Sequence, residues 1–423
     1  MKFDFYPKVI LANTTATITI KSLTNEVVID DNVDYILNFY PLERKSKFGS
    51  YNYQPDVLIK PRNGQFVFEQ YFPGEQEHKI IITNPKTKEE YAFRFYSVEA
   101  DLFYLNPYKG DLHMHSIRSD GKEPPEIVTA MCRKIGFDFM AITDHYQYQP
   151  SQEAIKFYHD LPIDMLITNG EEVHPKDNFT HIVNFGGNFS INEYIKNNEK
   201  IYYQEVNEIK DTIENVEDDK SCFEIASSIW VFNKIREADG LAIFCHPYWK
   251  VYQGYYISEE VTSYLLEHQP YDAYEVIGGY LPYEEESNTL QINRYYHEVA
   301  KGKQVPIVGV SDAHACYNNT FGWFYTITLA PSNSKDDIIK SIKECYSVAI
   351  ENIPNEAIRP VGPFRLVKYV LYLTKEYFPL HDEICNEEGQ YMLDYINGDK
   401  DAINKLKKSR GRVKRLINKI FNR

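Results

Sequence analysis

The sequence lacks the features of a membrane-spanning, secreted or nucleic-acid-coating protein. No apolar run approaches the roughly 18 residues of a membrane span, and residues 1–7 lack the apolar core of a signal peptide. The formal net charge of -15 disfavours long nucleic acid as a partner, because phosphate backbones are bound by basic surfaces. We therefore expect a cytoplasmic protein, which could still bind a small anionic substrate through metal ions.

The sequence also lacks paired cysteines, because its six cysteines form no Cys-x-x-Cys motif. Several lie in apolar strand or helix patterns, so we expect reduced thiols. A hydrophobic fraction of 43% and a charged fraction of 25% are typical of a globular protein. The 423 residues exceed one ordinary core and indicate one large domain with one or two smaller ones.

Residues 1–105 predict a small all-β domain. Thr15–Ile20 has the period-2 pattern of a strand, and the runs Ile80–Ile82 and Tyr91–Phe95 predict a hairpin. A β-sandwich of the immunoglobulin type fits this pattern. The region contains no cluster of titratable residues, so we expect it to pack against or shield the rest, with sugar or partner binding as the alternative.

Residues 108–352 alternate between strand and helix patterns, which indicates a parallel sheet or an α/β barrel. A first strand precedes His113, and a helix follows Pro124. An acidic stretch over residues 188–220 reads as an insertion with some helix. Seven strands can be counted, and those after the first are Phe139–Thr143, Met165–Thr168, His181–Phe185, Leu241–Cys245, Ala273–Ile277 and Val305–Val310.

The first of these strands carries the motif Gly-Asp-Leu-His-Met-His-Ser-Ile-Arg-Ser-Asp-Gly over residues 110–121. On a strand, His113 and His115 would point to one face. The turn that follows can bring Asp120 back over the same strand end. Two imidazoles and a carboxylate in this arrangement predict a site for divalent cations.

Further imidazoles and carboxylates follow the later strands, and catalytic groups of α/β barrels collect at such strand ends. Left unpaired they would be costly to bury, and metal ions would neutralise them. Glu172 is favoured over Glu171, which stays an alternative, and His174 is an outside candidate. The candidate metal ligands are His113, His115, Asp120, His145, Glu172, His181, His246, Asp312 and His314.

These motifs resemble the polymerase and histidinol phosphatase (PHP) superfamily of metallohydrolases over roughly residues 108–350. The resemblance implies a distorted seven-stranded (β/α) barrel, and the preceding β-sandwich narrows it to the CehA/McbA-like branch. The resemblance rests on the motifs Asp-Leu-His-Met-His-Ser with Ser-Asp-Gly (111–121), Ile-Thr-Asp-His (142–145), Gly-Glu-Glu-Val (170–173), His-Pro (246–247) and Ser-Asp-Ala-His (311–314).

The resemblance also implies a trinuclear metal centre. Mixed imidazole and carboxylate ligands suit Zn, Mn or Fe without choosing among them, and we expect two to three divalent ions per chain. The implied ligands are His113, His115, Glu172 and Asp312 for one ion, Glu172, His181 and His246 for a second, and Asp120, His145 and His314 for a third.

The predicted function is a metal-dependent hydrolase whose nucleophile is a hydroxide held between two ions that Glu172 bridges. Asp312 would orient this hydroxide and accept its proton, while the ion held with His145 and His314 would polarise the substrate. A small phosphomonoester or phosphodiester is the expected substrate. Hydrolysis of a carboxyl ester, carbamate or amide is the alternative, and a non-catalytic, metal-stabilised binding protein is the second. Candidate phosphate contacts are Arg118, Lys122, Arg236 and Lys250.

Residues 353–423 predict a helical C-terminal appendage. Its last part, Lys405–Arg423, contains nine basic and no acidic residues, with apolar side chains on one side. We expect a helix packed on its own acidic protein, with an anionic membrane surface as the alternative partner. The oligomeric state stays open.

Overall fold

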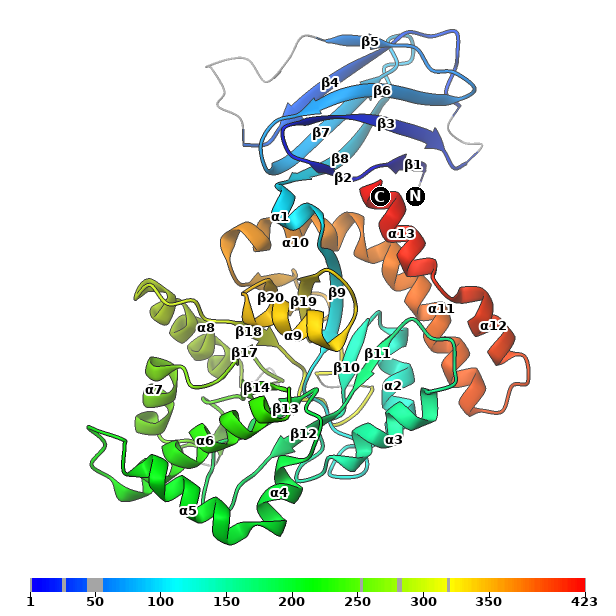
Figure 1. The fold of residues 1–423 in the computed structure, drawn as a ribbon. Coiled ribbons are helices and arrows are strands. Elements are labelled where there is room, and N and C mark those ends of the chain that lie inside the picture. The colour runs from blue at the N-terminus through cyan, green and yellow to red at the C-terminus, as the bar shows by residue number, and fades with distance from the viewer. Residues whose placement is uncertain are drawn as a thin grey trace. The chain divides into compact units, whose positions relative to one another are not determined.

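The computed structural model describes residues 2–24, 28–43, 56–251, 254–279, 284–317 and 320–422. The chain forms two compact units, each drawn in Figure 1. The first comprises residues 1–106, 368–381 and 411–423, and the second comprises residues 107–367 and 382–410. The residues expected to form a C-terminal appendage are therefore divided between the two units.

The first unit is a β-sandwich, which confirms the all-β prediction for the N-terminal region. In its strands buried residues such as Ile18 and Ile20 alternate with more exposed ones. Phe39 of one sheet packs edge-to-face on Phe72 of the other, with ring centroids 5.5 Å apart. In order, one sheet is β1 (Phe3–Tyr6), β3 (Thr14–Ser22) and β6 (Gln65–Phe72), and the other is β2 (Val9–Leu11), β8 (Glu90–Val98), β7 (Gln76–Thr83), β4 (Tyr35–Pro41) and β5 (Val57–Ile59).

The second unit contains two mixed sheets whose short strands are almost entirely buried. A six-stranded sheet has the order β11 (Leu166–Thr168), β10 (Phe139–Ala141), β9 (Asn106–Asp111), β19 (Phe324–Ala330), β20 (Ser347–Glu351) and β21 (Arg359–Val361). A five-stranded sheet has the order β12 (Gly170–Val173), β13 (Ile182–Phe185), β14 (Leu241–Phe244), β17 (Ala273–Ile277) and β18 (Ile307–Gly309).

The predicted seven-stranded barrel is not confirmed, because the described strands of this unit make these two sheets and a small sheet of β15 (Lys250–Val251) and β16 (Gly254–Tyr255), and no closed barrel. The chain leaves the first sheet at Asn169 and starts the second at once with β12. Strands β12, β13 and β14 then pair antiparallel, whereas a (β/α) barrel needs parallel neighbours. Isolated bridges from Met114 to Ala313 and from His145 to Glu172 link the two sheets. We call the line of these bridges the seam.

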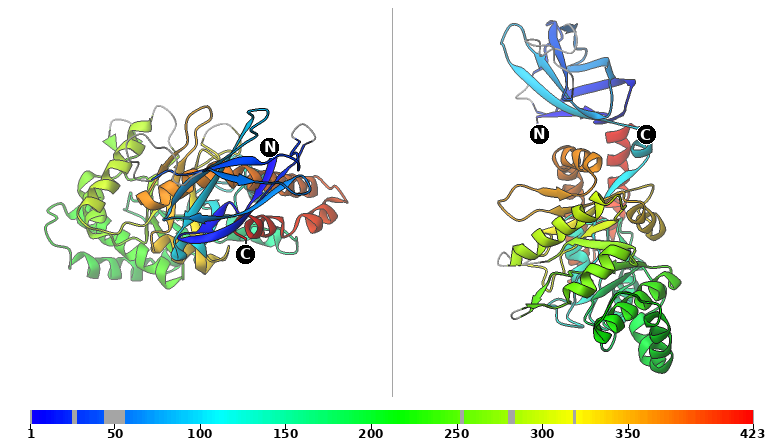
Figure 2. Two further views of the ribbon diagram at one scale, coloured as in Figure 1. Left: turned by 90° about the horizontal axis from the view of Figure 1, so that it is seen from above. Right: turned by 90° about the vertical axis from the view of Figure 1, so that its left-hand side faces the viewer.

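Helices surround these sheets, and their starts follow from local sequence. Ser190, Asp218 and Ser258 each accept a hydrogen bond from a backbone N–H of the first turn of α4, α6 and α7. The predicted insertion forms α4 and α5, which lie together with α6 on one flank of the unit, green in Figure 2. The helices of this part are α2 (Pro125–Lys134), α3 (Gln149–Tyr158), α4 (Ile191–Asn197), α5 (Glu199–Lys210), α6 (Asp219–Glu237), α7 (Glu259–His268), α8 (Glu285–Ala300) and α9 (Lys335–Lys343).

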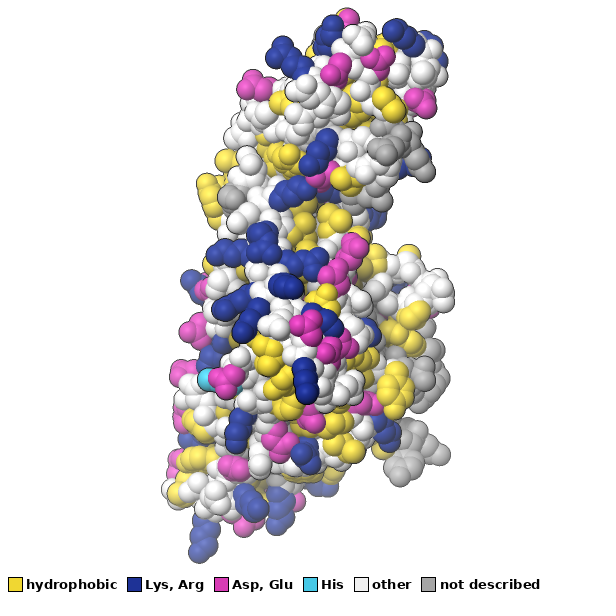
Figure 3. Space-filling view, turned by 90° about the vertical axis from the view of Figure 1, so that its right-hand side faces the viewer, with side chains coloured by type: hydrophobic (Ala, Val, Ile, Leu, Met, Phe, Trp, Pro, Cys, Tyr) yellow, Lys and Arg dark blue, Asp and Glu magenta, His cyan; other side chains and the backbone are white. Residues whose placement is uncertain are grey.

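The C-terminal region is helical from Phe364 onward, but the predicted appendage from residue 353 also contains β21, which pairs with β20 of the six-stranded sheet. In α13 the apolar face is buried within the first unit, where the carbonyl oxygen of Ile420 accepts a hydrogen bond of 2.8 Å from the backbone N–H of Lys8. Basic and acidic side chains are interspersed on the face drawn in Figure 3. Among the described residues no helix is both long and apolar enough to cross a bilayer. The helices are α10 (Phe364–Glu376), α11 (Phe378–Ile396), α12 (Ala402–Ser409) and α13 (Arg412–Phe421).

A buried arginine joins α2 to α11 in the second unit. Arg133 is fully buried and donates to Asp138 Oδ1 at 3.1 Å and to Glu388 Oε2 at 2.9 Å. Arg133→Met should lower the free energy of unfolding by about 3–5 kcal/mol, because two buried carboxylates lose their counter-charge. Urea unfolding measures this.

The matched control is Lys134→Met, one residue along the same helix. Lys134 also bonds α11, through Gln390 Oε1 at 2.8 Å, but it is only partly buried. Its loss should cost about 1 kcal/mol or less. Equal unfolding midpoints for the two variants would contradict a structural role for the Arg133 ion pairs.

Candidate metal centre

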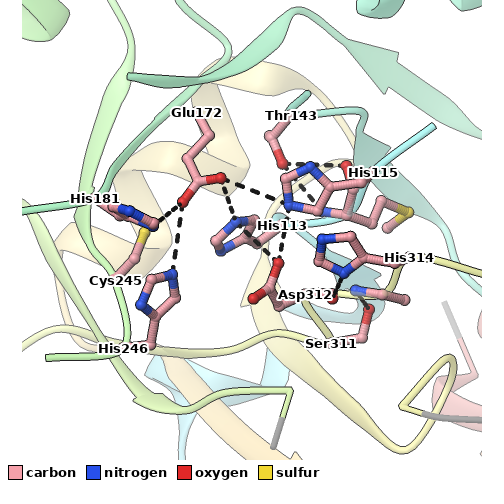
Figure 4. Close-up of polar contacts among 12 residues, drawn as sticks. His113, His115, Thr143, Glu172, His181, Cys245, His246, Ser311, Asp312 and His314 are labelled. Atoms are coloured by element: carbon pink, nitrogen blue, oxygen red, sulfur yellow. Dashed lines mark hydrogen bonds and ion pairs between the residues drawn. The ribbon is translucent and has the colours of Figure 1, made fainter. Parts of the chain in front are cut away.

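Glu172 of β12 lies at the centre of a group of imidazoles (Figure 4). Its Oε1 is 2.8 Å from His181 Nδ1 and 3.5 Å from His246 Nε2. Its Oε2 is 2.6 Å from His145 Nδ1 and 3.5 Å from His113 Nε2. One carboxylate therefore meets imidazoles that the chain supplies from both sheets.

Asp312 forms the second meeting point. Its Oδ1 is 2.9 Å from His115 Nε2 and 3.3 Å from His113 Nε2. The two histidines were expected on a strand, but β9 ends at Asp111, because backbone pairing beyond it is limited to the bridge at Met114. Backbone hydrogen bonds across the seam, from Asp312 N to His113 O and from His115 N to Ala313 O, still turn both imidazoles toward Asp312.

Asp120 and His314 form the open side of the group. Asp120 Oδ2 lies 3.2 Å from His314 Nε2 and 3.5 Å from His145 Nε2. The side chains of Asp120 and His314 are 54% and 36% exposed, whereas Glu172 is fully buried. The nine residues predicted as ligands are thus brought together, and solvent reaches them from this side.

The buried atoms at the centre fit divalent cations. His113 Nε2, His181 Nδ1 and both carboxylate oxygens of Glu172 are buried, and none makes a hydrogen bond. Burying imidazole nitrogens and carboxylate oxygens close together without hydrogen bonds costs free energy unless a cation lies between them. Imidazole with carboxylate is the donor set that Zn, Mn and Fe accept.

Electrostatics set the protonation of this donor set before a cation binds. Burial alone would raise the pKa of Glu172, but the neighbouring imidazoles of His181 and His113 lower it by more, so that the carboxylate pKa lies well below its usual range. Burial lowers the pKa of His181 to about 3. Burial also lowers the pKa of His145, but the adjacent Glu172 carboxylate outweighs it and raises the pKa to about 9, so a cation that binds there would displace a proton.

Two of the predicted ligands have an unusual backbone. His246 and Asp312, which follow β14 and β18, have φ angles of 24° and 47°, although neither is glycine. Such residues cost on the order of 1–3 kcal/mol each and cluster at functional sites. The conformation directs both side chains back over the ends of their strands.

Glu171, the alternative to Glu172, points to the other face of β12. Its carboxylate accepts hydrogen bonds from Ser190 Oγ at 2.7 Å and from the backbone N–H of Ile191 at 2.6 Å. Asn192 Nδ2 donates to Glu171 Oε2 at 2.9 Å and also to the Glu172 carbonyl oxygen at 3.0 Å. Glu171 therefore anchors the start of α4, and Glu172 faces the imidazoles.

Other residues belong to the site although they stand outside the predicted ligand set. His174, the outside candidate, is drawn in, with its Nε2 2.9 Å from His145 Nδ1. Glu275 Oε2 lies 3.2 Å from His113 Nδ1 and orients that ring, which sequence reasoning missed. The sequence signal that could have identified Glu275 is its position as a charged residue in an otherwise apolar, buried strand. Asp111 was also missed: it accepts from the backbone N–H groups of His113 and Ser311, both at 3.2 Å.

Comparison with known proteins gives one sequence match. The DNA polymerase/3'-5' exonuclease PolX of Bacillus subtilis is 39% identical over 82 residues, which is 18% of this chain and 14% of that protein. The chain thus spans a small part of this relative's length. No protein-family model matches the sequence.

Several solved structures are similar to the chain, among them the following two. A two-domain protein of Bacteroides vulgatus, which contains a predicted PHP-like metal-dependent phosphoesterase, gives a TM-score of 0.41 at 17% identity, with 59% of this chain and 66% of that chain covered. An amidohydrolase of Chromobacterium violaceum, solved with bound sulfate and no metal, gives 0.33 at 15% identity, with 49% and 87% covered.

The CehA/McbA-like branch, with its N-terminal sandwich, is not confirmed by these comparisons. The resemblance of this chain to the PHP superfamily, which its motifs indicate, is confirmed.

Proposed function

We propose that this protein is a metal-dependent hydrolase that acts on a small phosphomonoester or phosphodiester. The observation that supports it best is the fully buried Glu172 carboxylate, surrounded by imidazoles and without a hydrogen bond of its own. Burying such a group is costly unless a cation neutralises it. The substrate would be a small anion, because the net charge of -15 offers little to a long nucleic acid.

The ligand groups that we propose are those that the PHP resemblance implies. Glu172 would serve two ions, because His181 and His246 face one of its oxygens and His113 faces the other. The ions would come from Zn, Mn or Fe, two to three per chain. When bound, they lower the pKa of water toward about 7 and offset charge on the reacting oxygens.

The chain's own residues would then direct the reaction. Asp312 faces His113 and His115, is one-quarter exposed and can accept the proton of the attacking water. The exposed edge formed by Asp120, His145 and His314 would receive the substrate oxygen that gains negative charge.

The open side favours catalysis over a purely structural metal site. Structural sites are closed, whereas catalytic ones keep a position for water or substrate. The exposure of Asp120 and His314 provides such a position. A metal-stabilised binding protein would be expected to have a metal site that is closed to solvent. Within the enzyme class, hydrolysis of carboxyl esters, carbamates or amides remains the alternative.

Elemental analysis of gently purified protein should find two to three divalent ions per chain. Removing them with a chelator should abolish hydrolysis, and Zn or Mn should restore it, because the chain would lack a cation to activate water. His113→Ala with His115→Ala should lower the ion count of otherwise folded protein. Metal-free protein that Zn and Mn leave inactive would contradict the proposal.

The substrate class is tested with a panel of phosphomonoesters, phosphodiesters and carboxyl esters, each assayed with Mn and with Zn. We expect hydrolysis of phosphoesters to exceed that of carboxyl esters, since several cations can offset the charge on the equatorial oxygens of phosphorus. A clear preference for carboxyl esters would favour the alternative.

A further inference from the structure

Four aromatic side chains form a wall beside the His181 and His246 end of the metal centre, and we call Tyr146, Phe179, Trp249 and Tyr256 the aromatic rim. The ring centroid of His181 lies 5.2 Å from that of Tyr256 and 5.9 Å from that of Trp249. Trp249 and Phe179 lie 5.1 Å and 5.4 Å from Tyr256. The ring of Tyr146 lies 4.6 Å from His174, which itself adjoins His181.

The short strands β15 (Lys250–Val251) and β16 (Gly254–Tyr255) hold two rim residues side by side. Lys250 pairs with Tyr255, and the backbone N–H of Tyr256 donates to the carbonyl oxygen of Trp249 at 2.8 Å. Neighbouring positions of a ladder alternate between faces, so Trp249 and Tyr256 share a face that Tyr255 does not. That shared face is turned toward His181.

Core packing accounts for only part of the rim, since Tyr256 packs against the core of the unit but the other three side chains do not belong to it. Tyr248, next to Trp249 in sequence, is buried as a core aromatic, whereas Trp249 and Tyr256 are only partly buried. Tyr146 and Phe179 are 64% and 43% exposed, and large exposed aromatics beside a polar site are typical of ligand contact. Tyr146 also has a φ of 59°, a strained conformation at the edge of the site.

The rim offers mainly ring faces, although Lys220 Nζ lies 5.8 Å from the ring centroid of Phe179. Lys250 Nζ is held by Glu286 Oε2 at 2.7 Å, and Arg118 Nε is held by Glu153 Oε2 at 2.9 Å. Arg236, a third candidate phosphate contact, pairs instead with Asp272. A part of the substrate that extends past His181 would therefore meet the rings of Trp249 and Tyr256.

From this arrangement we propose that the aromatic rim binds a planar aromatic leaving group, so that the preferred substrates are arylalkyl or aryl esters. The inference rests on the proposed hydrolase function, because the rim adjoins the metal centre. The scissile ester would lie over the metal ligands and the ring of its alcohol portion would stack on Trp249 and Tyr256. Aromatic pairs prefer offset or edge-to-face contact at these separations.

The test compares benzyl phosphate with cyclohexylmethyl phosphate, which are similar in size and in the basicity of the leaving alcohol. With metal-loaded full-length protein we expect kcat/KM to favour the benzyl ester by about tenfold, the size of one or two stacking contacts. Trp249→Leu and Tyr256→Leu, each made alone, keep apolar volume but remove the ring, and should reduce this ratio to within about twofold. Benzyl and cyclohexylmethyl acetates provide the same comparison for carboxyl esters.

Tyr255→Leu is the matched control, because this neighbouring tyrosine is 40% exposed and contacts Tyr248 instead of the metal centre. It should keep the wild-type ratio. Equal kcat/KM for the two esters in the wild type, or an unchanged ratio in folded Trp249→Leu and Tyr256→Leu, would overturn the proposal.

Binding separates this inference from the proposed function. Calorimetry with benzylphosphonate and cyclohexylmethylphosphonate, which lack the scissile P–O–C bond, needs no turnover. If no ester is hydrolysed, the hydrolase proposal fails, and a benzyl preference that depends on Trp249 and Tyr256 would still support the rim. Equal affinities for the two phosphonates would overturn it.

Discussion

Glu172→Gln should remove at least two of the bound ions and lower turnover by about 1,000-fold or more, a loss of transition-state stabilisation typical of an essential electrostatic group. The neutral amide cannot balance two cations, and its NH₂ group would point a donor at an imidazole. The buried carboxylate oxygens now face His181, His246, His145 and His113. Elemental analysis and hydrolysis of the best panel substrate measure the two effects.

Glu171→Gln supplies the control from the adjacent position. It removes an equally buried charge from the same strand, but one held by Ser190, Ile191 and Asn192. We expect the ion count to stay the same and the unfolding free energy to fall by about 1–3 kcal/mol, as hydrogen bonds to a carboxylate are weakened. If Glu172→Gln bound as many ions as Glu171→Gln, the assignment of Glu172 as a metal ligand would be wrong.

Asp312→Asn should lower kcat by about 100- to 10,000-fold with little change in KM, the range of a lost general base. The amide keeps the shape of the carboxylate near His113 and His115 but cannot accept the proton of water. Elemental analysis must accompany the kinetics, because Asp312 is also a proposed ligand and its loss could empty a site.

Cys245→Ala is the control for covalent catalysis. This buried thiol lies close to His113 and Glu275, yet the proposed reaction gives it no role as a nucleophile. Its removal should leave turnover within about tenfold, as for a residue that acts only by packing. A phosphoryl- or acyl-enzyme trapped during turnover, or full activity in Asp312→Asn, would refute the role given to Asp312.

Most of the grouping could be predicted from sequence because most ligands follow a recognisable apolar strand. His145 follows β10, and the isolated bridge from His145 to Glu172 lies where strand ends were expected to meet, although Glu172 itself lies within the short strand β12. Glu275 could not be selected in the same way, since it lies in the middle of an apolar strand and its role depends on the ring of His113 across the site. Asp111 accepts a hydrogen bond from the backbone N–H of Ser311, which lies 200 positions later in the sequence. No local pattern reveals such a contact.

The sheet arrangement was harder to predict than the ligands. A strand as short and as buried as β13 has the same pattern whether it pairs parallel or antiparallel, and β12, with the sequence Gly-Glu-Glu-Val, has no apolar pattern that marks a strand. Their antiparallel pairing depends on the link around Asp177, where the chain turns back with a φ of 62°. The strand count therefore supported a barrel that the pairing does not form.

Cations that bind at the seam between the two sheets would link the folding of the chain to the supply of metal. Few backbone bonds cross the seam beyond the bridges at Met114 and His145, yet His113 and Glu172 approach from opposite sides of it. Ions that bind only the native chain would add about 2.7 kcal/mol to its stability at a free concentration 100 times their dissociation constant. A cell that starves this protein of its cation would then lose folded protein as well as activity, so metal scarcity would set the lifetime of the chain.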